Sequence, residues 1–369
     1  NVASPNVSGI STGTNTYLWS VSNGVCPSST AAVSIYRDQQ PVVNAGSNQT
    51  ICASTSTLSA ITQTFGTGLW SVLAGSSTLS NLNIANPNVS SISTGTNTYL
   101  WTVSNGVCPS ATAAVSVYRD EQPIANAGSN QTICASSATL SAITQTFGTG
   151  LWSVIAGSST LSSLNAVNPI VSGVSTGTNS YVWTVINGVC PSATAAVSIY
   201  RDQQPIANAG SNQTICASTS TLSAITQTFG TGLWSVIAGS STLSSLNIAN
   251  PNVSGISTGT NTYLWTVSNG VCPSATAAVA IYRDQQPIAN AGSNQTICAS
   301  SATLSAITQT FGTGLWSVIA GSSSLSNLNV ASPNVSGIST GTNTYLWTVS
   351  NGVCPTSTAA VSIYGDQQP

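Results

Sequence analysis

The sequence predicts an all-β chain, a tandem array of β-sandwich units that forms an extended rod. Two observations support this prediction. The string Ala-Gly-Ser-Asn-Gln-Thr-Ile-Cys begins at Ala45 and returns at Ala127, Ala209 and Ala291, and such a fixed period is the mark of a repeat array. Between turn residues, apolar and polar residues alternate over short runs, as in strands, and no run keeps the 3.6-residue period of a helix long enough to form one.

The period divides the 369 residues into a half repeat and four full repeats. Residues 1–41 form the C-terminal half of a repeat; repeat 1 is 42–123, repeat 2 is 124–205, repeat 3 is 206–287 and repeat 4 is 288–369. Asn1 aligns with Asn83, in the middle of repeat 1. Half a sandwich leaves its core open, so we expect the sequence to be a window on a longer array.

The strands of repeat 1 follow in order from turn chemistry. After a junction that begins at Pro41, Asn48 to Cys52 is the first predicted strand and Thr57 to Ile61 the second. Glycines 66 and 68 flank a turn, and Leu69 to Val72 starts a third strand. Residues 79–84 alternate as a fourth strand would.

Pro87 interrupts that run, and Val89 to Ser93 is the next predicted strand before a Thr-Gly-Thr-Asn turn at 94–97. The strongest signal is a final hairpin, Tyr99 to Val103 and Thr112 to Tyr118, around an Asn105-Gly106 turn. Seven or so short strands in about 80 residues predict an immunoglobulin-like sandwich. A β-solenoid is the competing interpretation, but solenoid coils recur every ~20 to 30 residues, and the period of this sequence is far longer.

Two tryptophans in each repeat are candidates for the core. The first stands early in the third strand, the central core position of this fold; we assign it to the core as Trp70, Trp152, Trp234 and Trp316. Trp101 shares one face of its strand with Tyr99, and we favour core packing for it over stacking on a sugar ring.

The composition is unusual because only 3% of the residues are charged, against about 25% in ordinary proteins. Hydrophobic residues make up 41%, enough for a core in each repeat and against disorder. The net charge of −2 and only four arginines exclude nucleic acid as a partner. No apolar run reaches the ~20 residues of a membrane span.

Three motifs resemble a known family: the string at Ala45, then Gly-Thr-Gly-Leu-Trp-Ser-Val, then Tyr-Leu-Trp-Thr-Val-Ser-Asn-Gly-Val-Cys-Pro. They are similar to the PKD-like, immunoglobulin-type repeats of large secreted surface proteins of Bacteroidetes-type bacteria, including gliding-associated adhesins. The resemblance covers the whole repeat. It implies export by the type IX route and a place outside the cell or on the bacterial cell surface.

The chain departs from the calcium-binding members of that family. A calcium ion takes 6 to 8 oxygen ligands, several of them carboxylates, whereas this sequence has six acidic residues, nearly all at the junctions between repeats. We therefore expect no metal and no cofactor. Because the sequence has no histidine or lysine and no recurring carboxylate pair, we also expect no catalysis.

The cysteines recur in a fixed pattern, one after the first strand and one after the Asn-Gly turn. Such pairs in a charge-poor, secreted-looking chain predict disulfides. Three schemes fit: within a repeat (Cys52 with Cys108), across a junction (Cys26 with Cys52), or to the next repeat (Cys52 with Cys190). We rank the first highest, although a sandwich places its two cysteines ~20 Å or more apart. The candidate cysteines are Cys52, Cys108, Cys134, Cys190, Cys216, Cys272, Cys298 and Cys354.

The few charges stand where repeats join. One hypothesis is an Arg and Asp pair that sets the angle between repeats; the other is solvated linker residues of little energy. Gly365 replaces the arginine in the last copy. These junction residues are Arg37, Asp38, Arg119, Asp120, Arg201, Asp202, Arg283 and Asp284.

A row of near-identical units indicates a structural stalk or shaft of an extracellular fibre or adhesin. Its partners would be neighbouring repeats of the same chain, other copies in a fibre, and a surface or glycan ligand bound through parts outside this sequence. Two alternatives remain: a glycan-binding module that acts by avidity, and a filament that assembles laterally through strand edges.

Overall fold

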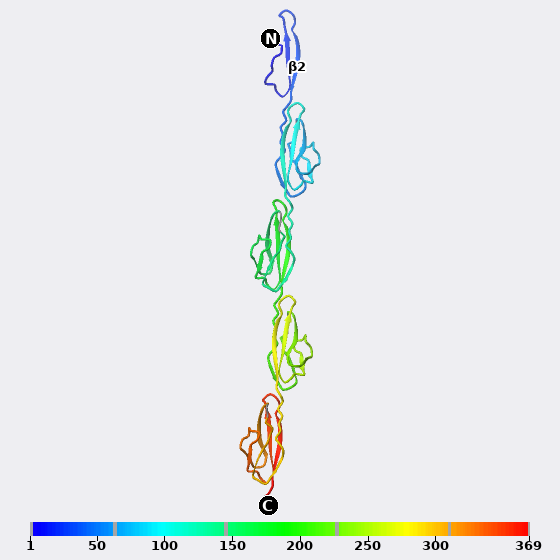
Figure 1. Ribbon diagram of the computed structural model, residues 1–369. Coiled ribbons are helices and arrows are strands. Elements are labelled where there is room, and N and C mark those ends of the chain that lie inside the picture. Colours follow the sequence, from blue (N-terminus) through cyan, green and yellow to red (C-terminus); the bar gives the residue numbers. More distant parts are fainter. Residues whose placement is uncertain (1–2, 62–64, 144–146, 226–228, 309–310, 368–369) are drawn as a thin grey trace. The chain divides into compact units, whose positions relative to one another are not determined.

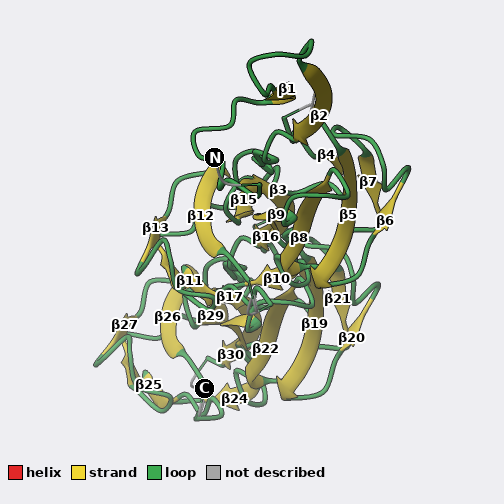
Figure 2. Ribbon diagram, turned by 90° about the horizontal axis from the view of Figure 1, so that it is seen from above, coloured by secondary structure: helices red, strands yellow, loops and turns green. Residues whose placement is uncertain are grey.

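The computed structural model describes residues 3–61, 65–143, 147–225, 229–308 and 311–367. The chain divides into two compact units, residues 1–131 with 135–200 and residues 132–134 with 201–369. The described residues form strands and no helix, as predicted. Figure 2 shows the strands with their connecting loops. None of these residues belongs to a helix long and apolar enough to cross a membrane.

Repeat 1 contains one sheet of four strands. Its order is β3 (Gln49–Ile51), β9 (Ala111–Arg119), β8 (Gly95–Ser104) and β5 (Thr67–Ala74). The two long central strands pair antiparallel, from Gly95 opposite Arg119 to Val103 opposite Ala111. β3 runs parallel to β9. The first strand of the sandwich thus lies beside the last and points the same way.

The second sheet has three short strands, in the order β4 (Ser56–Thr57), β7 (Asn88–Ser90) and β6 (Thr78–Leu79). Both of its pairs are antiparallel. Strands two, four and five of the repeat therefore form one sheet, and strands one, three, six and seven form the other. Strands two to seven are divided between the sheets as in the immunoglobulin fold, which confirms the predicted fold class, and the first strand joins the sheet of the last strand.

The other repeats copy this order, as the similar groups of strands in Figure 1 show. The leading half repeat holds the hairpin β1 (Gly13–Val21) and β2 (Ser29–Arg37). Repeat 2 holds β10 (Gln131–Ile133), β11 (Ser137–Thr139), β12 (Thr149–Ala156), β13 (Thr160–Leu161), β14 (Ile170–Ser172), β15 (Gly177–Ile186) and β16 (Ala193–Arg201).

Repeats 3 and 4 lie in the second unit, which also contains two short segments of repeat 2, residues 132–134 and 201–205. Repeat 3 holds β17 (Gln213–Ile215), β18 (Thr219–Thr221), β19 (Thr231–Ala238), β20 (Thr242–Leu243), β21 (Asn252–Ser254), β22 (Gly259–Ser268) and β23 (Ala275–Arg283). Repeat 4 holds β24 (Gln295–Ile297), β25 (Ser301–Thr303), β26 (Thr313–Ala320), β27 (Ser324–Leu325), β28 (Asn334–Ser336), β29 (Gly341–Ser350) and β30 (Ser357–Gly365).

The core of repeat 1 lies between its sheets. Every second residue of β8 points inward, so Tyr99, Trp101 and Val103 are buried together with Trp70 of β5. The two indole rings lie with their centroids 4.9 Å apart and tilted by 39°. Each large side chain buried in this way stabilises the repeat by ~1.5 to 3 kcal/mol. The same cluster recurs in repeats 3 and 4.

One glycine makes room for this ring pair. A Cβ atom on Gly68 would lie 1.9 Å from the Trp101 ring, so any other residue would have to displace a ring that is 2% exposed. The same approach recurs at Gly150, Gly232 and Gly314. Gly68 therefore belongs to β5 and to the packing of the core, rather than to the turn expected before that strand.

Further predicted elements differ from the structure. The second strand ends at Thr57, because Leu58 and Ala60 pair irregularly with the main chain around Pro87, which has no N–H to donate. The run at 79–84 leaves the sheet after Leu79 and covers Trp70, whose main-chain N–H donates to Leu82 and whose indole N–H donates to Ile84.

Another difference is the segment 94–97, where β8 already begins at Gly95. Asn97 is fully buried, and its side chain donates to the carbonyl oxygens of Ser93 and Gly95 and accepts from the Ser93 hydroxyl. The polar residues here satisfy local main-chain groups, as turn-forming side chains do. The Asn105-Gly106 pair likewise opens a longer loop, residues 105–110, rather than a tight turn.

Candidate functional site

Three disulfides join neighbouring repeats. Cys52 of repeat 1 is bonded to Cys190 of repeat 2, with Cα atoms 4.9 Å apart. The equivalent bonds are Cys134 to Cys272 and Cys216 to Cys354, and each pair has a sequence separation of 138. In every case the cysteine after the first strand of one repeat meets the cysteine after the Asn-Gly pair of the next repeat.

The parallel pairing of β3 with β9 brings the first cysteine to the junction. Ile51 lies opposite Arg119, the last residue of β9, and the Asp120 N–H donates to the Ile51 carbonyl at 2.8 Å. Cys52 therefore lies where the chain leaves repeat 1 for repeat 2. An antiparallel first strand would end at the opposite pole of the sandwich, out of reach of the next repeat.

The arginine at the end of the last strand secures this position. Arg119 donates through Nε to the Cys52 carbonyl at 3.3 Å and through Nη1 to the Ile92 carbonyl at 2.7 Å. Arg283 makes the same two bonds to Cys216 and Ile256. Because hydrogen bonds from a charged donor are stronger than neutral ones, this side chain holds the main chain of the first cysteine in place.

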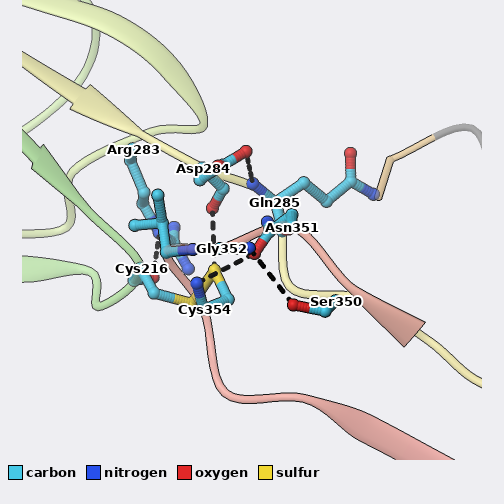
Figure 3. Close-up of a disulfide and its surroundings, with 9 residues drawn as sticks. Cys216, Arg283, Asp284, Gln285, Ser350, Asn351, Gly352 and Cys354 are labelled. Carbon is cyan, nitrogen blue, oxygen red and sulfur yellow. Dashed lines mark hydrogen bonds between the residues drawn. A yellow bond between two sulfur atoms is a disulfide. The ribbon is translucent and has the colours of Figure 1, made fainter. Parts of the chain in front are cut away.

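The second cysteine lies on a loop that forms hydrogen bonds with the link between repeats. In repeat 4 the Asn351 side chain donates to the Gln285 carbonyl at 2.9 Å and accepts from the Cys354 N–H at 2.9 Å (Figure 3). The Cys354 sulfur lies 3.9 Å from the Asp284 carbonyl oxygen. One asparagine thus binds the incoming link and shapes the loop that presents the sulfur.

The asparagine contact recurs at each junction. Its side-chain nitrogen donates to the link carbonyl at 2.6 Å for Asn105 with Gln39, 2.6 Å for Asn187 with Glu121, and 2.8 Å for Asn269 with Gln203. These asparagines were not among the residues expected to matter. The Asn-Gly pair was the only sequence signal for this contact, and the same pair is also typical of a hairpin turn.

The ranking of the three disulfide schemes was wrong. The structure does not contain the within-repeat pair of Cys52 with Cys108, because these cysteines belong to opposite poles of one sandwich. Cys108 and Cys298 carry no disulfide in the structure, and neither does Cys26. None of these three cysteines has a cysteine of the other kind at a sequence separation of 138 within residues 1–369.

The junction charges lie at the same place as the disulfides. Asp120 accepts at its carboxylate from the Val189 N–H of repeat 2 at 3.2 Å. The carboxylates of Asp38, Asp202 and Asp284 accept from the N–H of the following glutamine. Arg37 donates to the Ile10 carbonyl and Arg201 to the Cys134 carbonyl. The arginines thus bind main-chain carbonyls.

The first tryptophan of every repeat is buried in the sandwich, at 1% exposure for Trp70, Trp152, Trp234 and Trp316. A shallow hollow of 660 Å³ lies above the core of repeat 1, lined by Thr67, Asn83, Trp101 and their neighbours. Equivalent hollows of 560 to 610 Å³ recur in the other repeats. Trp101 is 2% exposed and presents only a ring edge beneath Gly68.

No protein-family model matches the chain, and no curated protein matches it in sequence. Among solved structures, it is similar to the N-terminal eight Ig domains of Down Syndrome Cell Adhesion Molecule, with 12% identity and a TM-score of 0.44. That match covers 96% of this chain and 53% of the other, so the chain spans about half its length.

Two further structures show a weaker likeness. Sidekick-1 immunoglobulin domains 1–5 match with 13% identity and a TM-score of 0.33, over 91% of this chain and 84% of that one. The human Desmocollin-1 ectodomain matches with 9% identity and a TM-score of 0.29, over 95% and 86%. The assignment of the repeats as immunoglobulin-like sandwiches rests on their own strand order.

Proposed function

We propose that this chain is the stalk or shaft of an extracellular bacterial surface fibre or adhesin, with no catalytic role. The observation that carries the proposal is the disulfide between successive repeats, such as that between Cys52 and Cys190. The core clusters of repeats 1, 3 and 4 contain none of the bonded cysteines. The effect of the bond is to fasten one repeat to the next, which suits a chain that must transmit load or hold a distance.

The chemistry of the chain supports this role. Disulfides of this kind form and persist in oxidising compartments, which favours a place outside the cell. With 3% charged residues, the chain offers little for ionic partners. It also lacks the histidine and lysine side chains on which most acid, base and covalent catalysis depends.

An extended arrangement of the repeats is part of the proposal. A ten-residue strand such as β8 is ~34 Å long, so four and a half repeats end to end would reach roughly 160 to 200 Å. Small-angle X-ray scattering of the oxidised 369-residue chain tests this. A maximum dimension near that range supports the shaft, and one below about 100 Å would exclude it.

The cellular location of the protein can be tested by electron microscopy of source cells labelled with an antibody raised against this chain. We expect regularly spaced label along thin fibres that leave the cell surface. Label confined to secreted soluble material, or to a smooth coat, would contradict the shaft.

A glycan-binding module that acts by avidity is the second candidate, and the recurring hollow favours it. The buried Trp101 ring has no free face to stack on a sugar, so binding would depend on polar groups such as Thr67 and Asn83. A glycan array probed with the chain tests this candidate. Binding that falls in an Asn83→Ala variant and its equivalents in the other repeats would favour the module over the shaft.

Lateral assembly is the third candidate, since β5 is an edge strand with exposed Leu69 and Leu73. Two features oppose it: the Trp70 N–H is already bonded to Leu82, and a β-bulge follows between Val72 and Ala74. Both are ways in which proteins protect sheet edges. Sedimentation of the chain as a monomer up to high concentration would exclude lateral assembly.

A further inference from the structure

The three disulfides overlap along the chain. They enclose residues 52–190, 134–272 and 216–354, so each ring begins before the previous one ends. Every peptide bond between Cys52 and Cys354 lies inside at least one ring. A covalent connection therefore persists across any single break in this part of the backbone.

The segments that link one disulfide to another are short and contain strands. Cys190 closes one ring, and Cys216 opens another a short way along the chain. The segment between them contains β16 and β17, the last strand of repeat 2 and the first of repeat 3. A strand rises about 3.3 Å per residue, close to the ~3.3 to 3.6 Å that a fully extended residue spans. Pulling such strands lengthens them very little.

We propose that the oxidised array is a covalent cable, in which tension passes through disulfides and the short segments between them, which contain extended strands, and bypasses the rest of each repeat. This proposal depends on the proposed function in one respect, because a surface shaft is what would place the chain under tension. The route from Cys52 through its disulfide to Cys190 and on to Cys216 uses the segment 190–216 instead of the whole backbone between Cys52 and Cys216. Fully stretched, that segment reaches about 90 Å, whereas the backbone from Cys52 to Cys216 reaches about 590 Å.

The cable limits how far a repeat can unfold under load. A sandwich pulled apart through its ends must lengthen toward the full stretch of one repeat, about 290 Å. The parallel path through the disulfides becomes taut long before that. Covalent bonds then carry the force, and the strands of the two sheets stay paired.

Optical tweezers that hold the full chain by its two termini test this directly. The shortest covalent path, through residues 1–52, 190–216 and 354–369, reaches about 330 Å, whereas the whole backbone reaches about 1,300 Å. We expect the oxidised chain to stop near the shorter length and the reduced chain to unfold in steps of whole repeats. Whole-repeat steps in the oxidised chain would overturn the proposal.

Two serine variants give a matched pair. Cys190→Ser opens a bond on the shortest path, so the best remaining route runs through the other two disulfides and the limit should rise to about 720 Å. Cys272→Ser also removes one disulfide, but its bond is not on that path, so the limit should remain about 330 Å. Equal lengthening in both variants would refute the assigned path even if the chain is a surface shaft.

A protease site inserted between Glu121 and Gln122 gives a second readout that needs no applied force. Only the bond between Cys52 and Cys190 encloses this position among the three disulfides. After cleavage, the parent chain and the Cys272→Ser variant should stay at full mass on a non-reducing gel, while Cys190→Ser should separate into two fragments. Separation of the parent chain before reduction would count against the cable, whereas the electron microscopy above tests the cellular role independently.

Discussion

The Asn351 side chain donates a hydrogen bond of 2.9 Å to the main-chain oxygen of Gln285, so a loop of repeat 4 holds the link by which the chain enters it. The same side chain accepts from the Cys354 N–H, further along the loop. Asn351 therefore determines both the position of the link and the position of the Cys354 sulfur. The disulfide adds a covalent bond to a contact that is already ordered by hydrogen bonds.

Replacing Asn351 should separate these two roles. Asn351→Ala loses both hydrogen bonds and should lower the free energy of unfolding of repeat 4 by about 1 to 3 kcal/mol. Asn351→Asp keeps the acceptor for Cys354 but turns a carboxylate toward the Gln285 carbonyl. Denaturant unfolding of the oxidised chain measures both variants. If the free energy of unfolding of Asn351→Ala equalled that of the parent, the hydrogen bonds between this side chain and the link would have no energetic role.

Reduction should destabilise the array without destroying its sandwiches. In the chain-entropy model, a ring as long as that closed by Cys52 and Cys190 contributes about 5 kcal/mol. Each reduced repeat still has its own core, so we expect a lower melting temperature and less cooperative melting, with the far-ultraviolet circular dichroism unchanged at room temperature. Calorimetry with and without reductant checks this. Loss of the β signal on reduction alone would mean that the bonds support the cores themselves.

Gly68→Ala should be costly because the new Cβ would lie 1.9 Å from the Trp101 ring. Forcing atoms into a packed core costs ~1 to 3 kcal/mol or more. Gly106→Ala is the control: it has φ +85 and nothing within 4 Å of the new atom, so it carries only the left-handed backbone cost of ~1 to 2 kcal/mol. Thermal melts compare the two, and a smaller effect for Gly68 would show that the ring pair can shift.

The stability of the chain should change little between pH 4 and 9, because few groups titrate in that range. Burial raises the pKa of the Tyr99 phenol above its ordinary value of 10.0, and the hydrogen bond with Ser77 opposes this more weakly. The folded state therefore binds this proton more tightly than the unfolded state. The contribution is complete below pH 10 and is lost as the pH rises through the folded pKa.

Melting temperatures from pH 4 to 11 check this expectation, with Tyr99→Phe as the control. The parent should lose stability above pH 10, and the variant should lose less. A shift of many degrees between pH 4 and 9 would mean that charged contacts hold the array together, contrary to its composition.

The sequence by itself determined the repeat, the all-β class and most of the strands. These follow from local rules: alternation marks Tyr99, Trp101 and Val103 as one buried face, and Trp70 occupies the core position of the third strand. The near absence of charge also predicts that the chain does not bind nucleic acid. The strands and the core positions depend on neighbours in the chain, so one repeat contains that information, whereas the period itself appears when the copies are compared.

Only the tertiary structure decided how the repeats are joined. Cysteine spacing allowed three pairings, and the choice depends on the direction of β3 beside β9, a contact between the two ends of a repeat. The parallel register brings Cys52 to the exit of its own repeat and within reach of Cys190 in the next. Arg119 was expected in an ion pair or in solvent, and it binds the Cys52 carbonyl instead. Non-local pairings of this kind leave no periodic signal in the sequence.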